Sequence, residues 1–122
     1  MSYDEIVEGI SLPANADLSA SQFLFGTITN SSGQGRVAVS GDGADADGVI
    51  YEGGNAAGQV TKLAVKGVLK VIAGGNVTAG QLVASDATGK AVVAASGDKV
   101  LGKAITSAVS GDVFPILWKP VG

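Results

Sequence analysis

The chain has 122 residues and a formal net charge of −3, and it contains 19 glycines but neither cysteine nor histidine. Without these two residue types it has no disulfide, no thiol nucleophile, and neither the commonest general base nor the commonest transition-metal ligand, so we expect no metal, no cofactor and no enzymatic activity. Its eight Lys and Arg residues are scattered and no apolar run reaches about 18 residues, so neither nucleic acid nor a membrane is an expected partner.

Residues 1–22 differ from the rest of the chain, and we predict that they form an extended N-terminal arm ahead of a single domain at 23–122. Five apolar side chains of the arm stand among acids and small polar residues: Tyr3, Ile6, Val7, Ile10 and Leu12. A short helix could begin here, but Pro13 and the polar residues after it would end the helix early. The arm is either a frayed terminus or a segment that docks on a partner. Since the first residues include no apolar run of signal-peptide length, we expect synthesis in a cytoplasm.

From Phe23 onward the sequence predicts short β-strands separated by glycine-rich turns. The predicted strands are 23–29, 36–40, 49–52, 60–66, 68–72, 81–84, 91–94, 100–105 and 113–118. Gly67 predicts a bulge or bend within one long strand. Pro115 cannot donate to a β-ladder, so the last strand is predicted to lie at an edge or to be bulged. The spacing of strands and turns predicts an all-β fold, a small antiparallel β-barrel or sandwich.

The stretch GDGADADG at 41–48 brings three carboxylates close together in sequence: Asp42, Asp45 and Asp47. Carboxylates among glycines can wrap a calcium ion. The spacing does not match an EF-hand loop, however, and no flanking helices are predicted. Asp and Gly are also the residues expected in a solvated turn between strands, and we favour that interpretation.

A second candidate is Lys90, which follows Gly89 in the hairpin sequence GQLVASDATGK. Lipoyl and biotinyl carrier domains present a modified lysine in a similar setting, with a glycine ten residues upstream. Their lysine is normally flanked by Asp or Met and preceded by an acidic run, whereas here Asp86 is the one acid nearby. A polar residue that leaves a hairpin turn is the simpler interpretation.

Five glycine-containing segments follow one another in the second half of the chain: Gly67–Gly74, Val77–Val83, Ser85–Val92, Gly97–Ala104 and Gly111–Val113. The first four have the patterns G-V-x-x-V-x-A-G, V-x-A-G-x-x-V, S-D-x-x-G-K-A-V and G-D-x-V-x-G-x-A, and a Gly-Asp turn opens the last strand. This order, across about half of the chain, resembles the small capsid decoration (cement) proteins of tailed phages. The stretch before Val60, with GDGADADGVIYEGGNAAG, matches that family less well.

The resemblance implies a compact β-barrel or β-tulip domain that binds the outer surface of an icosahedral phage head. It also implies a homotrimer at local threefold axes, with the major capsid protein as partner, that reinforces the shell against the pressure of the packaged DNA. The protein would then be a virion component made in the host cytoplasm. Such work requires a self-complementary interface and a docking surface, and it requires no nucleophile, cofactor or metal.

The scarce large side chains are the candidates for a capsid or subunit interface: Tyr3, Ile6, Ile10, Leu12, Phe114 and Trp118. Trp118 is either an interface anchor or a lid over the core. Two functions of other classes stay open. One is a lipoyl- or biotinyl-type carrier domain modified at Lys90, and the other is a carbohydrate-binding or host-adhesion β-module on a virion, which would need exposed aromatic side chains.

Overall fold

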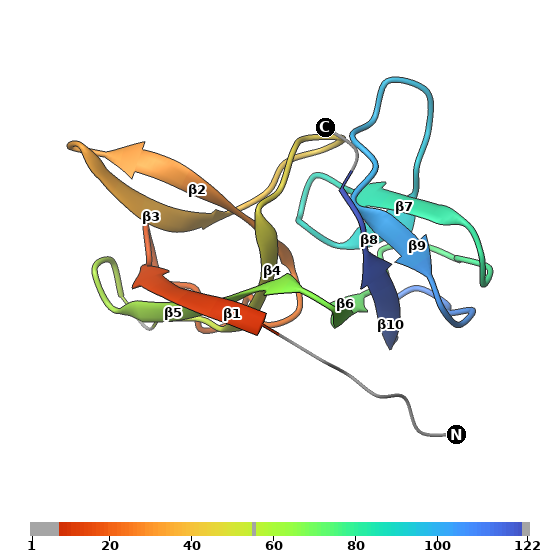
Figure 1. Ribbon diagram of the computed structural model, residues 1–122, viewed down its shortest axis with the longest axis horizontal. Helices are drawn as coiled ribbons and strands as arrows, with labels where there is room; N and C mark the ends of the chain where they lie inside the picture. The colour runs from red at the N-terminus through yellow and green to blue at the C-terminus, as the bar shows by residue number, and fades with distance from the viewer. Residues whose placement is uncertain (1–7, 55, 121–122) are drawn as a thin grey trace.

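The computed structural model describes residues 8–54 and 56–120, and within these ranges the chain forms ten β-strands and no helix. The strands make two antiparallel sheets of five strands each, which lie side by side (Figure 1). The prediction of an all-β antiparallel fold is therefore confirmed. Within the described ranges, no helix has the length and apolarity needed to cross a membrane.

The first sheet has the strand order β1-β5-β4-β2-β3. Its strands are β1 (Glu8–Pro13), β2 (Phe25–Ser31), β3 (Gln34–Val39), β4 (Gly48–Glu52) and β5 (Val60–Lys66). Just beyond β1, Ala14 forms a parallel bridge with Val37 of β3, and the N–H of Asn15 donates to the Val37 carbonyl at 2.8 Å. The two outer strands therefore meet at one end, and the sheet curls toward a small barrel.

The second sheet has the order β6-β10-β9-β7-β8. Its strands are β6 (Val68–Ile72), β7 (Leu82–Ser85), β8 (Ala91–Val93), β9 (Gly102–Ala104) and β10 (Val113–Trp118). Here Ala73, just beyond β6, forms a parallel bridge with Ala91 of β8, and the N–H of Gly74 donates to the Ala91 carbonyl at 2.8 Å. This sheet is closed in the same way as the first.

The two halves of the chain therefore repeat one topology, with each strand of the second half five places after its equivalent in the first. The hydrogen bonds at the closure repeat as well. Ala14 donates to the carbonyl of Gln59 at 2.7 Å and accepts from the glycine before it at 2.8 Å. Ala73 makes the same two bonds, at the same lengths, with Asp112 and the glycine before it. The fold is an internal duplication of a five-stranded unit.

A buried glycine begins the fourth strand of each unit, Gly48 in β4 and Gly102 in β9. A Cβ atom at Gly48 would collide with the carbonyl oxygen of Ala64 in β5, and one at Gly102 would collide with that of Leu117 in β10. Glycine lets the two backbones approach closely at both equivalent positions.

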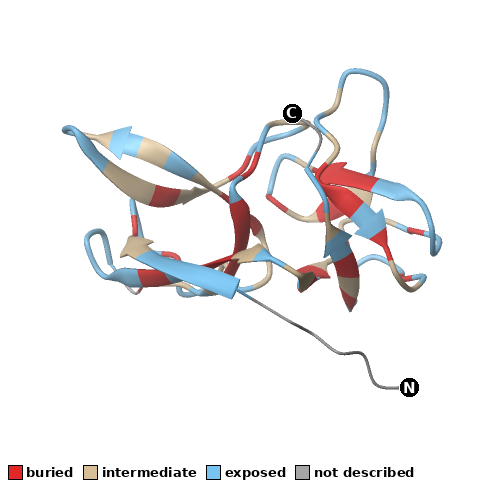
Figure 2. Cartoon of the chain, in the orientation of Figure 1, coloured by how far each residue is buried: buried red, intermediate tan, exposed pale blue. Residues whose placement is uncertain are grey.

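The larger hydrophobic core combines residues from both sheets, and a smaller one lies within the first sheet. In Figure 2 the buried segments lie on both sides of the junction between the sheets. The larger side chains of the shared core include Phe25 and Val49 from the first sheet and Leu69, Phe114 and Ile116 from the second. The smaller cluster contains Ala14, Leu18, Val37, Ile50 and Leu63. Because one core is shared, we expect the two units to unfold together.

The chain crosses from the first sheet to the second at Gly67, whose φ of 107° is suited to glycine. Gly67 therefore separates two strands of different sheets, where the sequence predicted a bend within one strand. Hydrogen bonds support the junction: the N–H of Ile72 donates to the Phe23 carbonyl at 3.0 Å, and the N–H of Lys70 donates to the Tyr51 hydroxyl at 2.8 Å.

Part of the predicted N-terminal arm belongs to the first sheet. Residues 8–13 form β1, which pairs with β5 and places Ile10 opposite Leu63. The division into an arm at 1–22 and a domain at 23–122 stays a prediction.

The prediction that β10 lies at an edge or is bulged is wrong. β10 lies between β6 and β9, and its pairings carry no register shift. The carbonyl of Pro115 accepts a hydrogen bond from Ile105, just beyond the end of β9 at Ala104. The backbone nitrogen of Pro115 points the same way, so the missing N–H falls where the β9 ladder has already ended.

Candidate docking surface

The strands of the second sheet alternate between buried and outward-facing residues. In β10, Phe114 and Ile116 are 2% and 0% exposed, whereas Val113 and Leu117 are 50% and 44% exposed. An antiparallel sheet with one solvated face normally carries polar residues on that face. β10 is therefore unusual, because it is apolar on both faces.

The outward-facing residues of β6, β7, β9 and β10 adjoin one another across the sheet. Val113 lies opposite Ile72, Pro115 opposite Lys70, Leu117 opposite both Val68 and Lys103, and Leu82 opposite Lys103. We call these eight residues the apolar face. Six of them are apolar, and its two charged residues are lysines. A contiguous apolar patch on a sheet marks a candidate protein-contact surface.

The equivalent strand of the first unit, β5, differs at these positions. Its outward side carries Val60 and Lys62 in the places that Val113 and Pro115 occupy in β10. The Nζ atom of Lys62 lies 3.5 Å from a carboxylate oxygen of Glu52, and both side chains are well exposed. The apolar character is therefore a property of the second unit and does not follow from the repeated topology.

The predicted interface residues are dispersed. Tyr3 and Ile6 lie outside the described residues. Ile10 is 41% exposed on β1, and Leu12 on the same strand is half-buried against the smaller core cluster. These two residues do not belong to the apolar face.

Phe114 and Trp118 both lie on β10, but their side chains pack in or against the core. Phe114 is 2% exposed, so its side chain offers no surface for a partner. Trp118 is half-buried, packs against the shared core, and stands with its ring centroid 6.2 Å from that of Phe25. Sequence reasoning thus selected a strand of the apolar face through its aromatic residues and missed the outward-facing Val113 and Leu117. The sequence carried no signal for them, because VFPILW is apolar at every position and only the burial along the strand alternates.

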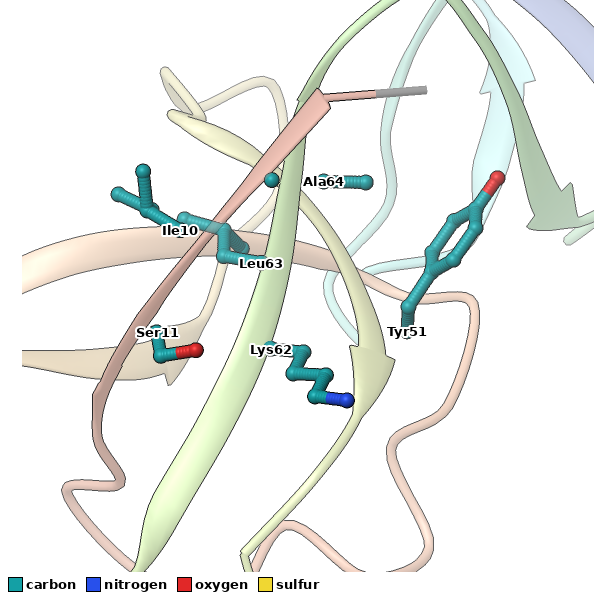
Figure 3. A pocket seen from close by; sticks show the side chains of 7 residues that line it. Ile10, Ser11, Tyr51, Lys62, Leu63 and Ala64 are labelled. Carbon is teal, nitrogen blue, oxygen red and sulfur yellow. The ribbon is translucent and has the colours of Figure 1, made fainter. Parts of the chain in front are cut away.

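A pocket of about 290 Å³ lies on the first sheet beside Tyr51 (Figure 3). It is lined by Gly9, Ile10, Ser11, Tyr51, Lys62, Leu63 and Ala64. In Figure 3 the side chains of Ile10 and Leu63 point to one side of the β1–β5 pair, and those of Lys62, Ala64 and Tyr51 point to the other. The Tyr51 hydroxyl and the Lys62 ammonium are both engaged within the chain. The pocket brings no acid, base or nucleophile together in a catalytic arrangement.

Lys90 lies half-buried immediately before β8, next to a turn held by several hydrogen bonds. One carboxylate oxygen of Asp86 accepts hydrogen bonds from the N–H and hydroxyl of Thr88, both at 2.8 Å, and from the N–H of Lys90 at 2.9 Å. Burial raises the pKa of Asp86, but these hydrogen bonds and the Lys90 charge together hold it below its ordinary value. Asp86 therefore stabilises the turn that precedes Lys90.

Two of the three carboxylates at 41–48, those of Asp45 and Asp47, accept hydrogen bonds within the chain. One oxygen of Asp47 accepts hydrogen bonds from the N–H of Ile28 at 2.7 Å and from the hydroxyl of Thr27 at 3.1 Å. Asp45 accepts one from the N–H of Ala46 at 3.0 Å. Among the residues that the structure describes, no group of three or more acidic side chains is arranged to hold a metal ion.

The aromatic side chains of the described ranges are all buried or half-buried: Phe23, Phe25, Tyr51, Phe114 and Trp118. Phe23 and Tyr51 pack edge to face, with ring centroids 5.4 Å apart. Sugar-binding surfaces use exposed aromatic rings, so this arrangement gives the carbohydrate-binding alternative no support.

Together, the fold and this surface describe a small, internally duplicated β-protein with an apolar sheet face suited to protein contact. The chain belongs to the phage cement protein family, whose model matches residues 12–119. Its fold is similar to that of the N base of the bacteriophage phi29 head fiber gp8.5, with a TM-score of 0.77, 16% identity, and coverage of 93% of this chain and 95% of that chain. None of the curated proteins compared with the chain matches it.

Membership of this family identifies a structural, phage-head-associated protein. It agrees with the resemblance found in the second half of the sequence and extends that resemblance over the first half. It also favours the structural role over a carrier domain modified at Lys90 and over a carbohydrate-binding module.

Proposed function

We propose that this protein decorates the outer surface of a phage head, where it binds the major capsid protein and stabilises the shell. The match to the phage cement protein family over residues 12–119 carries the proposal. In keeping with it, the fold offers two units on a shared core and an apolar outer face on one of them. We propose no catalytic role.

The assembled form that we propose is a homotrimer at the local threefold axes of the head. In a threefold ring each copy contacts its neighbour through two different patches, and three copies bind the shell together. Weak contacts from each copy then add up to tight attachment, because the second and third copies bind as parts of one assembly.

The proposed contacts with the capsid include the N-terminal segment. Ile10 and Leu12 lie on β1, and Tyr3 and Ile6 precede it in the sequence. Trp118 stays a proposed contact through its exposed part. Phe114 has no place in the contact surface, because it is buried and supports the fold.

Co-sedimentation with empty, expanded heads tests the proposal. Purified protein should pellet with the heads up to a saturating number of copies, and the decorated heads should disassemble at a higher temperature than bare heads. Pre-saturating the heads with unlabelled protein is the control, because it should block binding of labelled protein. Binding that shows no saturation, or an unchanged disassembly temperature, would contradict the proposal.

A further inference from the structure

We infer that the apolar face is the contact between copies of this chain, and that it packs against the acidic loops of the neighbouring copy in a head-to-tail ring. The inference deepens the proposed function and rests on its self-association. It names the two patches that would meet.

The composition of the apolar face argues for a protein partner. Its central strand presents Val113, Pro115 and Leu117 outward, and Leu82, at 48% exposed, extends the patch on β7. Outward positions of a solvated sheet are ordinarily polar, and β5 of the first unit follows that rule at Lys62, where β10 has Pro115, although not at Val60. Burial of apolar side chains in a contact is favourable, because it removes apolar surface from water.

The charges of the face argue against contact with a copy of itself. The two charged residues of the face are Lys70 and Lys103, on strands that flank β10 on either side. A symmetric face-to-face dimer would bring these lysines toward the lysines of the other copy in a desolvated interface. Like charges placed together in such an interface are unfavourable. The face therefore calls for a different patch that carries negative charge.

The chain offers such a patch in two loops outside the apolar face. The loop after β3 carries Asp42, and the loop before β9 carries Asp98. The N–H of Lys99 donates to the carbonyl of Gly43 at 3.1 Å, and Gly43 is packed so closely on Asp98 that an added Cβ would collide with its carboxylate. The two loops are thus held together. Glycine and alanine around Asp42 let a neighbour approach the carboxylates closely.

The size of the face explains why the contact suits an assembly. Four strands at about 4.8 Å and five residues at about 3.4 Å give a plane of roughly 19 by 17 Å. That is well under the roughly 800 Å² per partner buried in a stable two-protein complex. The contact is therefore weak by itself and closes when three copies are held together, either at high concentration or on a head.

Charged substitutions on the face test the inference, and the internal duplication supplies a matched control. Val113→Lys and Leu117→Lys place a third lysine on the apolar face. Val60→Lys makes the same change at the position of β5 equivalent to Val113, where the side chain is 66% exposed. Sedimentation equilibrium at high protein concentration measures self-association of each variant. We expect at least about tenfold weaker association for the two face variants and no change for Val60→Lys.

Zero-length carbodiimide cross-linking locates the contact. A mixture of copies with normal and heavy nitrogen is cross-linked both in solution and on decorated heads, and only links between the two isotopic forms are counted. We expect Lys70 or Lys103 of one copy to link to Asp42 or Asp98 of another. Lys103→Glu should weaken association, and adding Asp42→Lys should restore it.

The outcomes separate this inference from the proposed function. Absence of such links both in solution and on heads would overturn the inference. Face variants that still form rings but no longer bind heads would overturn it too, because the face would then meet the capsid, and the proposed function would stand. A cross-linked ring that binds no heads would support the inference and contradict the proposed function.

Discussion

The backbone carbonyl of Gly89 accepts a hydrogen bond from the N–H of Phe25 at 2.8 Å, and this bond joins the tip of the β7–β8 hairpin to the first sheet. Gly89 is buried, and an added Cβ would lie 2.6 Å from a methyl carbon of Val39. The equivalent hairpin between β2 and β3 has Gly33 at its tip, with open space around it. The hairpin that suggested a carrier lysine is therefore part of the joint between the two units.

These two glycines give a matched pair of substitutions. Both have a positive φ, 83° at Gly89 and 84° at Gly33, so replacement by alanine imposes the same backbone cost of about 1–2 kcal/mol. Gly89→Ala adds a steric clash with Val39, worth about 1–3 kcal/mol more. We expect urea denaturation to show a larger loss of unfolding free energy for Gly89→Ala than for Gly33→Ala. Equal losses would show that the hairpin tip does not dock on the first sheet.

The Tyr51 hydroxyl is a second connection between the units, because it accepts a hydrogen bond from the backbone of Lys70 on β6. Tyr51→Phe keeps the ring that packs on Phe23 and removes the acceptor. We expect a loss of about 1 kcal/mol in unfolding free energy, and faster hydrogen exchange at the Lys70 amide. An unchanged exchange rate at Lys70 would argue against this hydrogen bond. The amide of Val71, which is fully buried on the same strand, is the internal control.

Most strands could be predicted from the sequence because β-forming residues and glycine turns alternate clearly after Phe23. The direction of side chains on β10 was harder to predict, because VFPILW is apolar on both faces and so gives no period of two. The aromatic residues looked like interface anchors, but residue type alone does not show whether a large side chain is buried or exposed. Phe114 was therefore expected on the surface that Val113 and Leu117 occupy.

The duplication could not be predicted from the sequence because equivalent positions carry different residues. Counting from the matched closure bonds, Thr61 corresponds to Phe114, and Lys62 to Pro115. The few positions that coincide include glycines required by backbone geometry, such as Gly48 and Gly102, and small or β-branched residues, such as Ala14 with Ala73 and Val60 with Val113. Glycine is so frequent in this chain that these coincidences are invisible without the strand pairing. The same holds for the apolar face, which forms only when strands from distant parts of the chain pair.

Asp86 predicts a specific dependence of stability on pH. Its pKa in the folded protein lies below the ordinary value, so the stability that it contributes is fully present above the unfolded-state pKa of about 3.9 and is lost as pH falls through the lower folded-state pKa. Asp86→Ala should cost about 1 kcal/mol at pH 7 and less at pH 3, because the wild-type bonds weaken on protonation. Urea midpoints at the two pH values measure this difference.

Asp42→Ala is the control for the loss of one acid, since its side chain is exposed and lies in a loop of the same protein. A pH dependence in Asp86→Ala identical to that of the wild type would contradict the prediction. The comparison uses differences between midpoints, so changes in the other carboxylates cancel.

Two N-terminal truncations separate the predicted arm from the sheet. Removal of residues 1–7 leaves β1 and its pairing with β5, so we expect unchanged unfolding free energy and, if the arm docks on the capsid, weaker binding to heads. Removal of residues 1–13 deletes β1, exposes the edge of β5 and should destabilise the fold itself. Circular dichroism melts and head co-sedimentation measure both effects. Full head binding by the protein that lacks only residues 1–7 would exclude a role for Tyr3 and Ile6.

The equivalent glycines Gly48 and Gly102 test whether the two units fold as one. Alanine at either position forces apart two paired strands, in the first unit for Gly48→Ala and in the second for Gly102→Ala, at a cost of about 3 kcal/mol or more. Gly41→Ala is the control, because Gly41 has open space around it and no positive φ. Since the shared core contains side chains of both sheets, the protein should unfold in a single transition, and each substitution should lower the midpoint of that transition. Hydrogen exchange at the Tyr51 amide in the first unit and Trp118 fluorescence in the second should therefore report the same loss of stability. If Gly102→Ala instead gave two transitions, with the first unit unfolding as in the wild type, the units would be independent and the shared core would contribute little to their coupling.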